Sequence, residues 1–246
     1  MTILCIETST SVCSAAICKD GAPIKQCICL EGSNHARLLP RYIEELLSFA
    51  REQQLSIDAV ALSEGPGSYT GLRIGTSTAK GLCYGMDIPL IPVPTLAVLC
   101  EAAKAQSPIT NYKSQITNYK PAILVPMIDA RRMEVYTTDG GEKARAVVVE
   151  NEESVLPPSL VERDGERLPV YYFGDGAAKC QSVLTSPNWH FIPGIVPEAK
   201  YMGGLVESQK SKVESQMISG QKLAYYEPYY LKEFVAAQSH VKGLNS

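Results

Sequence analysis

The sequence of 246 residues lacks any apolar run near the ~18 residues that a membrane-spanning helix needs. Its first ten residues, MTILCIETST, lack the basic region, apolar core and cleavage site of a secretory signal. We therefore expect a soluble, cytoplasmic protein. An excess of positive charge is also missing, since the formal net charge is −3 and the isoelectric point is about 5.7. Direct binding of nucleic acid would need a local basic patch or another subunit, and the sequence shows no such patch.

Residues that would mark a metal site or a catalytic nucleophile are scarce. The three histidines, His35, His190 and His240, are far apart, and Leu39 stands where a second histidine would complete an HxxxH pair. No C-x-x-C pair occurs among the eight cysteines, so we expect reduced cysteines that pack in the core. The loop Glu64–Ser68 does not match the G-x-S-x-G nucleophile motif. We therefore expect no metal and no catalytic residue.

The first half of the chain contains alternating strand and helix patterns. The predicted strands are 2–7, 13–19, 24–30, 58–63 and a short one within 88–96. The apolar spacing is helical from Leu39 to Ala50, from Thr70 to about Met86, and in the run LAVLCEAAKA. Short turns join the first three strands, which predicts antiparallel hairpins. This order indicates an α/β protein with a mixed sheet covered by helices.

Composition changes at residues 107–120, where the sequence ITNYK occurs twice at an interval of seven residues. We interpret this segment as a surface linker between a first lobe at 1–106 and a second lobe with a C-terminal tail at 121–246. The patterns of the second half are a strand at 122–129, a hairpin-like pair, a strand at 170–174, a helical start at GDGAAKC and a helix within 196–210. Two successive halves of this kind predict a duplicated fold whose second copy is reduced.

Two turns that follow apolar strands are candidate phosphate sites. Thr8, Ser9 and Thr10 offer hydroxyl and N–H groups after the first strand, although a plain β-turn fits the same residues. Gly65 and Gly67 frame a loop at the start of a helix, where free N–H groups and the helix dipole favour anions. The loop is not a Walker A sequence, because the lysine and its following serine or threonine are missing. These five residues are weak candidates for cofactor binding.

The helix after Thr70 carries small residues along one face. At ~100° per residue, a stripe is formed by Gly71, Ile74, Gly75, Thr78, Leu82 and Gly85, opposite to Arg73, Thr76, Ser77, Lys80 and Tyr84. The preceding helix has an apolar stripe that includes Leu39, Ile43, Leu46 and Leu47. Side by side, the two stripes would form half of a helical bundle that a partner completes. The alternative is that the glycines pack on the protein's own sheet.

Five segments together resemble the TsaB (YeaZ) family. They are ILCIETST at 3–10, HARLLP at 35–40, SEGPGSYTGLRIGTSTAKGL at 63–82, PMIDARRMEVY at 126–136 and GDGA at 174–177. The match covers most of residues 1–136 and is sparse beyond them. The resemblance implies the duplicated, ribonuclease H-like ASKHA fold of actin, Hsp70 and sugar kinases. It also implies a non-catalytic, activating subunit of the bacterial machinery that attaches threonylcarbamoyl to adenosine-37 of tRNAs that read ANN codons.

In that family the catalytic relative TsaD carries the metal-binding histidines and the nucleotide site, and an ATPase, TsaE, joins the complex. The resemblance therefore implies that ATP and metal bind to the partner subunits and that tRNA is reached through the complex alone. The two helical stripes would dock TsaD, or would form a homodimer of the free chain. A small-molecule kinase with the ASKHA fold and a glycoprotease-like peptidase are the alternative functions.

The sequence departs from the family pattern at two turns. Glu7 ends the first strand where the family usually has aspartate, which weakens a nucleotide role. Asp129-Ala130-Arg131-Arg132 stands in the place of an Asp-x-Gly phosphate turn of the wider fold. Arg131 and Arg132 would bind a phosphate or a partner carboxylate, or would form an exposed structural salt bridge.

Overall fold

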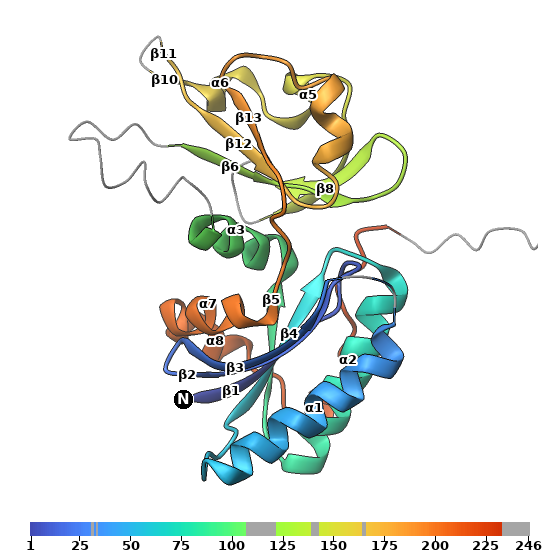
Figure 1. Cartoon of the computed structure of the whole chain (residues 1–246), viewed down its shortest axis with the longest axis vertical. Coiled ribbons are helices and arrows are strands. Elements are labelled where there is room, and N and C mark those ends of the chain that lie inside the picture. The colour runs from blue at the N-terminus through green and yellow to red at the C-terminus, as the bar shows by residue number, and fades with distance from the viewer. Residues whose placement is uncertain (31, 33, 107–121, 139–142, 164–165, 233–246) are drawn as a thin grey trace, which may run out of the picture.

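The computed structural model describes residues 1–30, 32, 34–106, 122–138, 143–163 and 166–232. It has two lobes, and helix α3 (Thr95–Gln106) lies between them (Figure 1). Leu99 of α3 is fully buried and shares a core cluster with Ile128 and Phe173 of the second lobe. This helix therefore links the hydrophobic cores of the two lobes. The predicted linker at 107–120 lies outside the described residues.

A five-stranded mixed sheet forms the first lobe. Its strands are β1 (Thr2–Glu7), β2 (Cys13–Lys19), β3 (Ala22–Cys29), β4 (Ala59–Gly65) and β5 (Leu90–Pro94), in the order β3-β2-β1-β4-β5. Strands β1 to β3 form antiparallel hairpins, whereas β4 is parallel to β1 and β5 is parallel to β4. Because side chains alternate along a strand, Leu4 and Ile6 face one core cluster while Ile3 and Cys5 face another. Both faces of the sheet are therefore buried.

Helices α1 (His35–Glu52) and α2 (Tyr69–Met86) cover one face of this sheet (Figure 1). The predicted stripe of α1 supplies fully buried side chains to the core beneath the helix, including Leu39 and Leu46. The hydroxyl of Ser68 caps the start of α2 by accepting a hydrogen bond from the N–H of Gly71 at 3.3 Å. The helix ends at Asp87, whose φ of +53° is left-handed.

The second lobe contains two three-stranded sheets among its described residues. Strands β6 (Ile123–Pro126), β12 (Val170–Phe173) and β13 (Trp189–Ile192) are parallel, and β7 (Ile128–Asp129), β8 (Glu134–Thr138) and β9 (Ala144–Val148) are antiparallel. The other elements are α5 (Glu152–Val155), α6 (Pro158–Val161), β10 (Glu162–Arg163), β11 (Glu166–Arg167) and the 3-10 helix η1 (Ala178–Ser182). Val125, Tyr172 and Trp189 belong to the core cluster that these elements enclose.

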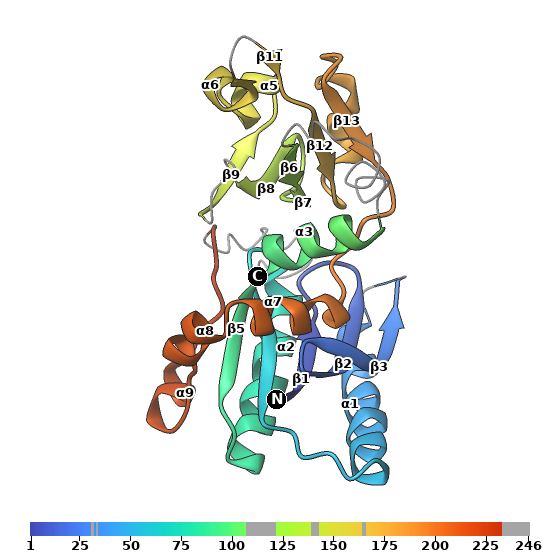
Figure 2. The same ribbon diagram turned by 90° about the vertical axis from the view of Figure 1, so that its left-hand side faces the viewer.

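After β13 the chain returns to the first lobe. The 3-10 helix η2 (Ala199–Tyr201) and the helices α7 (Met202–Ser208), α8 (Lys210–Gln216) and α9 (Gln221–Tyr225) lie there (Figure 2). Met202 and Val206 pack on the face of the sheet opposite α1 and α2, and Leu223 packs in the cluster beneath those two helices. The predicted second lobe and C-terminal tail at 121–246 did not include this return: residues 199–225 pack on the first lobe. Their apolar side chains complete the core of the first lobe.

The order of strands and helices predicted for the first half is confirmed. The single strand predicted at 122–129 is instead two strands, β6 and β7, which belong to different sheets. The helical start at GDGAAKC is the short helix η1. No disulfide joins the eight cysteines, and none of the described helices is long and apolar enough to cross a membrane. That the second lobe is a reduced copy of the first stays a prediction.

The packing of α7 on β2 leaves no room for a methyl group at Gly203. A Cβ there would lie 2.7 Å from the Cβ of Cys18 and 2.8 Å from the carbonyl oxygen of Gly21. We expect Gly203→Ala to lower the free energy of unfolding, measured in urea, by about 1–3 kcal/mol. Gly204→Ala is the matched control, because nothing lies within 4 Å of its Cβ; it should stabilise the protein by about 0.5–1 kcal/mol. Equal effects would show that α7 does not pack on β2.

Candidate functional site

The candidate phosphate turns lie at the edge of the first sheet that is nearest to the second lobe (Figure 1). One follows β1 and the other follows β4, and these two strands are parallel neighbours. Open α/β sheets bind their ligands at the carboxyl ends of parallel strands. The candidate site therefore consists of these turns and of the residues that face them from the second lobe and from the C-terminal segment.

Glu7 ends β1 and is fully buried. Its Oε1 accepts hydrogen bonds from the backbone N–H of Ser9 at 2.6 Å and from the Ser9 hydroxyl at 2.5 Å. Its Oε2 has no partner among the described residues. Burial raises the pKa of Glu7 and the charge of Asp175 adds to the rise, while the hydrogen bonds from Ser9 oppose it. The Glu7 carboxyl group therefore holds the turn that follows it, and its charged form is disfavoured.

Helix α2 packs directly against this turn through its glycines. The hydroxyl of Thr8 donates a hydrogen bond to the carbonyl oxygen of Gly71 at 2.9 Å. A Cβ at Gly71 would lie 2.0 Å from the carbonyl oxygen of Thr8, and one at Gly75 would lie 2.3 Å from its Oγ1. Both glycines are buried. They therefore permit close packing within the chain, as the alternative interpretation of the stripe stated.

The loop before α2 packs against the same turn. The N–H of Ser68 donates to the carbonyl oxygen of Ser9 at 2.6 Å. A Cβ at Gly67 would lie 2.3 Å from that oxygen. The hydroxyl of Thr10 accepts a hydrogen bond from the N–H of Val12 at 3.3 Å, the side-chain contact of an ST-turn. The hydroxyl groups of Thr8, Ser9 and Thr10 are therefore all hydrogen-bonded inside the protein.

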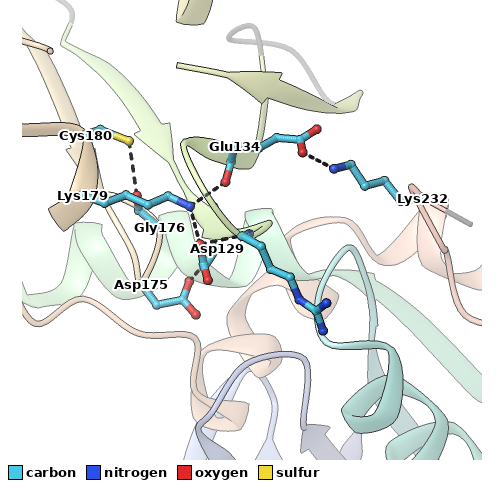
Figure 3. Close-up of polar contacts among 8 residues, drawn as sticks. Asp129, Glu134, Asp175, Gly176, Lys179, Cys180 and Lys232 are labelled. Atoms are coloured by element: carbon cyan, nitrogen blue, oxygen red, sulfur yellow. Dashed lines mark hydrogen bonds and ion pairs between the residues drawn. The ribbon is translucent and has the colours of Figure 1, made fainter. Parts of the chain in front are cut away.

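A C-terminal segment, which follows α9, crosses this edge of the sheet. The N–H of Tyr229 donates to the carbonyl oxygen of Glu64 at 2.7 Å. A Cβ at Gly65 would lie 2.5 Å from the carbonyl oxygen of Tyr229. Lys232 then forms an ion pair with Glu134 of the second lobe (Figure 3). Sequence reasoning missed this segment, because an extended stretch without periodicity gives no signal.

Two aspartates and a lysine of the second lobe complete the site (Figure 3). The N–H of Asp129 donates to Oδ1 of Asp175 at 3.0 Å. The ammonium group of Lys179 pairs with the Asp129 carboxylate and donates to the carbonyl oxygen of Glu134 at 2.7 Å. Burial raises the pKa of Asp175, and the nearby charge of Asp129 adds to the rise. The one pattern in the sequence that marks this part of the site is the GDGA turn after a strand. It does not indicate a role for Asp175 or Lys179.

Arg131 and Arg132 are exposed, and their φ values are +72° and +49°. The N–H of Arg131 donates to Oδ1 of Asp129 at 3.2 Å. Neither arginine side chain forms an ion pair within the described part of the chain, so the predicted surface salt bridge is not found there. Binding of a phosphate or a partner carboxylate by these arginines stays a prediction.

A groove with a volume of about 920 Å³ runs between α1 and α2. Its apolar walls are formed by Pro40, Ile43, Leu47, Leu55, Ile57, Leu82, Met86 and Ile88. Gly81 also lines the groove, and nothing lies within 4 Å of its ideal Cβ. Exposed apolar grooves of this kind are typical of protein docking surfaces.

The ten residues predicted for a partner interface divide between this groove and the core. Leu39, Leu46, Gly71 and Gly75 are buried inside the lobe, so their assignment to a surface is wrong. Ile43, Leu47, Thr78 and Leu82 line the groove. Ile74 is partly buried against the core, and Gly85 is exposed outside the groove lining. A helical stripe shows which residues share a face, but it does not show whether that face meets the sheet or solvent.

In the described part of the chain, no group of three or more His, Cys, Asp or Glu residues is placed to hold a metal ion. His35 is buried at the start of α1, and its Nε2 lies 3.1 Å from the carbonyl oxygen of Val12.

Comparisons with known proteins agree on one group of relatives. The family model described as TsaD, tRNA N6-adenosine threonylcarbamoyltransferase, matches residues 30–157. The tRNA threonylcarbamoyladenosine biosynthesis protein TsaB of Haemophilus influenzae is 29% identical over 246 residues, covering 96% of this chain and 95% of the relative. The protein of the same name from Escherichia coli is 31% identical over 169 residues and covers 68% of each chain.

A solved structure from Pseudomonas aeruginosa, described as an uncharacterized protein with similarity to peptidase YEAZ, has the same fold. It superimposes with a TM-score of 0.69 at 21% identity, covering 94% of this chain and 99% of the other. Together with the family model, this likeness indicates an ASKHA-like α/β fold.

A substitution at Gly75 tests the contact between α2 and the turn after β1. Gly75→Ala places a methyl group 2.3 Å from the Thr8 hydroxyl oxygen, so we expect the thermal midpoint to fall by about 2–12 °C. Gly81→Ala in the same helix meets open space, and its better helix propensity should raise the midpoint by about 2–4 °C. Calorimetry of the free chain measures both. A Gly75→Ala protein as stable as the wild type would mean that α2 stands away from the turn.

Glu7 predicts a pH dependence of stability. Because folding raises its pKa above the ordinary value of 4.5, the folded state keeps the proton longer than the unfolded state as the pH rises. The free energy of unfolding should therefore decrease above about pH 4.5, until the pH exceeds the folded pKa. Glu7→Gln cannot ionise, and its stability in urea should decline less between about pH 4 and pH 8. The pKa of Asp175 is also raised by folding, so the Glu7→Gln protein should still lose some stability as the pH rises. Parallel pH profiles for wild type and variant would contradict this assignment.

Proposed function

The chain belongs to the TsaB family of tRNA threonylcarbamoyladenosine biosynthesis proteins, and from this premise we propose that it is a non-catalytic, activating subunit of that machinery. The machinery attaches threonylcarbamoyl to adenosine-37 of tRNAs that read ANN codons. In this proposal the chain acts by forming a heterodimer with a TsaD-like catalytic subunit. A TsaE-like ATPase completes the complex.

The packing at this edge of the sheet supports a function in which the residues of the edge take no part in the reaction. The backbone of Thr8 and Ser9 lies against Gly67 and Gly71, and Tyr229 lies against Gly65. The protein's own atoms thus stand where an ASKHA enzyme would hold the phosphates of a nucleotide, and the residues present do not fit that ligand. We therefore propose that the ATP and the metal of the reaction bind to the partner subunits. In the same proposal, tRNA reaches the catalytic site of the TsaD-like subunit by binding to the assembled complex.

The groove between α1 and α2 is the observation that carries the docking proposal. Its apolar side chains belong to the stretch of sequence that matches the TsaD family model, residues 30–157. A TsaD-like partner therefore has counterparts of both helices. Two related helix pairs can pack face to face around a pseudo-twofold axis, which closes a four-helix bundle and buries both apolar grooves. A homodimer of the free chain would use the same surface.

A charged side chain in the groove tests this docking surface. Gly81 lies in the groove with open space at its Cβ, so Gly81→Glu should leave the fold intact. We expect it to weaken the complex with a TsaD-like subunit by about 100-fold or more, because the partner would bury an unpaired carboxylate. Tyr84→Glu places the same charge on an exposed position of α2 outside the groove lining and is the control.

Isothermal titration calorimetry of the two purified subunits measures the affinity, and circular dichroism verifies the fold of each variant. The proposal fails if Gly81→Glu binds the partner as tightly as the wild type. It also fails if the two glutamate variants lose affinity equally, since the docking surface would then lie elsewhere on α2.

A further inference from the structure

A second hollow lies on α2, between the helix and the C-terminal segment. Its volume is about 520 Å³, and its lining includes Tyr69, Arg73, Thr76, Lys80, Tyr230 and Lys232. The α2 residues among them belong to the helix face opposite the small-residue stripe. The hollow is therefore distinct from the packed turn after β1, although it borders the docking groove at Ser77.

Positive charge is concentrated in this hollow, although the chain as a whole carries −3. Three of its lining side chains are cationic and one, Glu227, is acidic. The ammonium group of Lys80 donates to the carbonyl oxygens of Ala224 at 2.6 Å and Tyr226 at 3.1 Å, and these neutral groups fix its position while leaving its charge uncompensated. In the described part of the chain, no carboxylate forms an ion pair with Arg73 or Lys80. An anion in the hollow would therefore meet the side chains of Arg73 and Lys80, whose positions are fixed and whose charges are not neutralised.

Thr76 also lines the hollow, and its buried hydroxyl group is unpartnered within the described residues. Thr76 is 6% exposed, and its Oγ1 has no hydrogen-bond partner among the described residues. Thr78 on the same helix shows the usual alternative, since its hydroxyl donates to the carbonyl oxygen of Ile74 at 2.9 Å. A buried hydroxyl without a partner is uncommon in folded proteins because its desolvation is not compensated. The position of Thr76 is explained if a ligand oxygen accepts its proton.

Two tyrosines form an aromatic wall beside these groups. The rings of Tyr69 and Tyr230 are 5.0 Å apart. The guanidinium group of Arg73 lies 5.4 Å from the centre of the Tyr69 ring and donates to the Tyr69 hydroxyl at 2.9 Å. This contact orients the guanidinium group, and within the described residues it uses one of the five N–H donors. A basic hollow beside aromatic rings is the arrangement with which proteins hold a phosphate and its attached nucleobase.

We propose that this hollow binds the phosphate group of a nucleotide, either free or within an RNA strand. Arg73 and Lys80 face the phosphate oxygens, the Thr76 hydroxyl donates to one of them, and the tyrosine wall supports the base. The site supplies the local basic patch that the acidic sequence as a whole did not reveal. It belongs to the free chain, so it stands whether or not the proposed docking groove is correct.

The test measures binding to the purified full chain without a partner subunit. The probes are ATP, AMP and a fluorescent single-stranded oligoadenylate, at low salt. We expect saturable binding of at least one probe, weakened about ten-fold or more by Arg73→Gln. Arg41→Gln, which removes the same charge from an exposed position of α1, should leave the affinity unchanged. Thr76→Val should weaken binding about three-fold or more, and Thr76→Ser, which keeps the hydroxyl, should restore it.

The probes separate the two sources of the phosphate. Binding of ATP and AMP assigns the site to a free nucleotide, whereas binding of the oligoadenylate alone assigns it to RNA. The proposal is overturned if none of the three probes binds saturably. It is also overturned if Arg73→Gln and Arg41→Gln change the affinity equally, because the binding would then reflect charge in general.

Discussion

The contact between the turn after β1 and the start of α2 determines what the rest of this molecule can do. Gly71 and Gly75 bring the helix so close that the backbone and hydroxyl of Thr8 occupy the space of their missing side chains. The Glu7 carboxyl group accepts a hydrogen bond from Ser9 of the turn, and the N–H of Tyr229 donates to Glu64 at the start of the neighbouring loop. The turn, the start of α2 and the C-terminal segment thereby pack tightly at this edge of the sheet. In the proposed function, the chain therefore acts through the outer faces of its helices.

Much of the first lobe could be predicted from the sequence, because its strands and helices have strong periods of two and 3.6 residues. The same periods could not show which face of α2 meets the sheet. Gly71 and Gly75 share a stripe with Thr78 and Leu82, yet the glycines are buried while the other two line the groove. The buried face is the one that packs against Thr8 and against Leu62 of β4, and the contact between Thr8 and Gly71 joins residues 63 positions apart.

The parts of the site that escaped prediction depend on long-range contacts between short or irregular segments. Lys179 meets Asp129 across 50 residues, and Lys232 meets Glu134 across 98. The C-terminal segment has no periodicity, so its course over Gly65 and along α2 could not be anticipated. With that course known, α2 has three distinct faces. One packs on the turn, one lines the apolar docking groove, and one forms the basic hollow.

In the proposed function, the chain contributes a surface to threonylcarbamoyl transfer and no reacting group. The most direct measurement is reconstituted transfer to tRNA by a TsaD-like subunit and a TsaE-like ATPase, with and without this chain. We expect no transfer by the chain alone and a strong rise in the activity of the other two subunits when it is added. Full activity of those two subunits in its absence, or transfer by the chain alone, would rule out a non-catalytic, activating role.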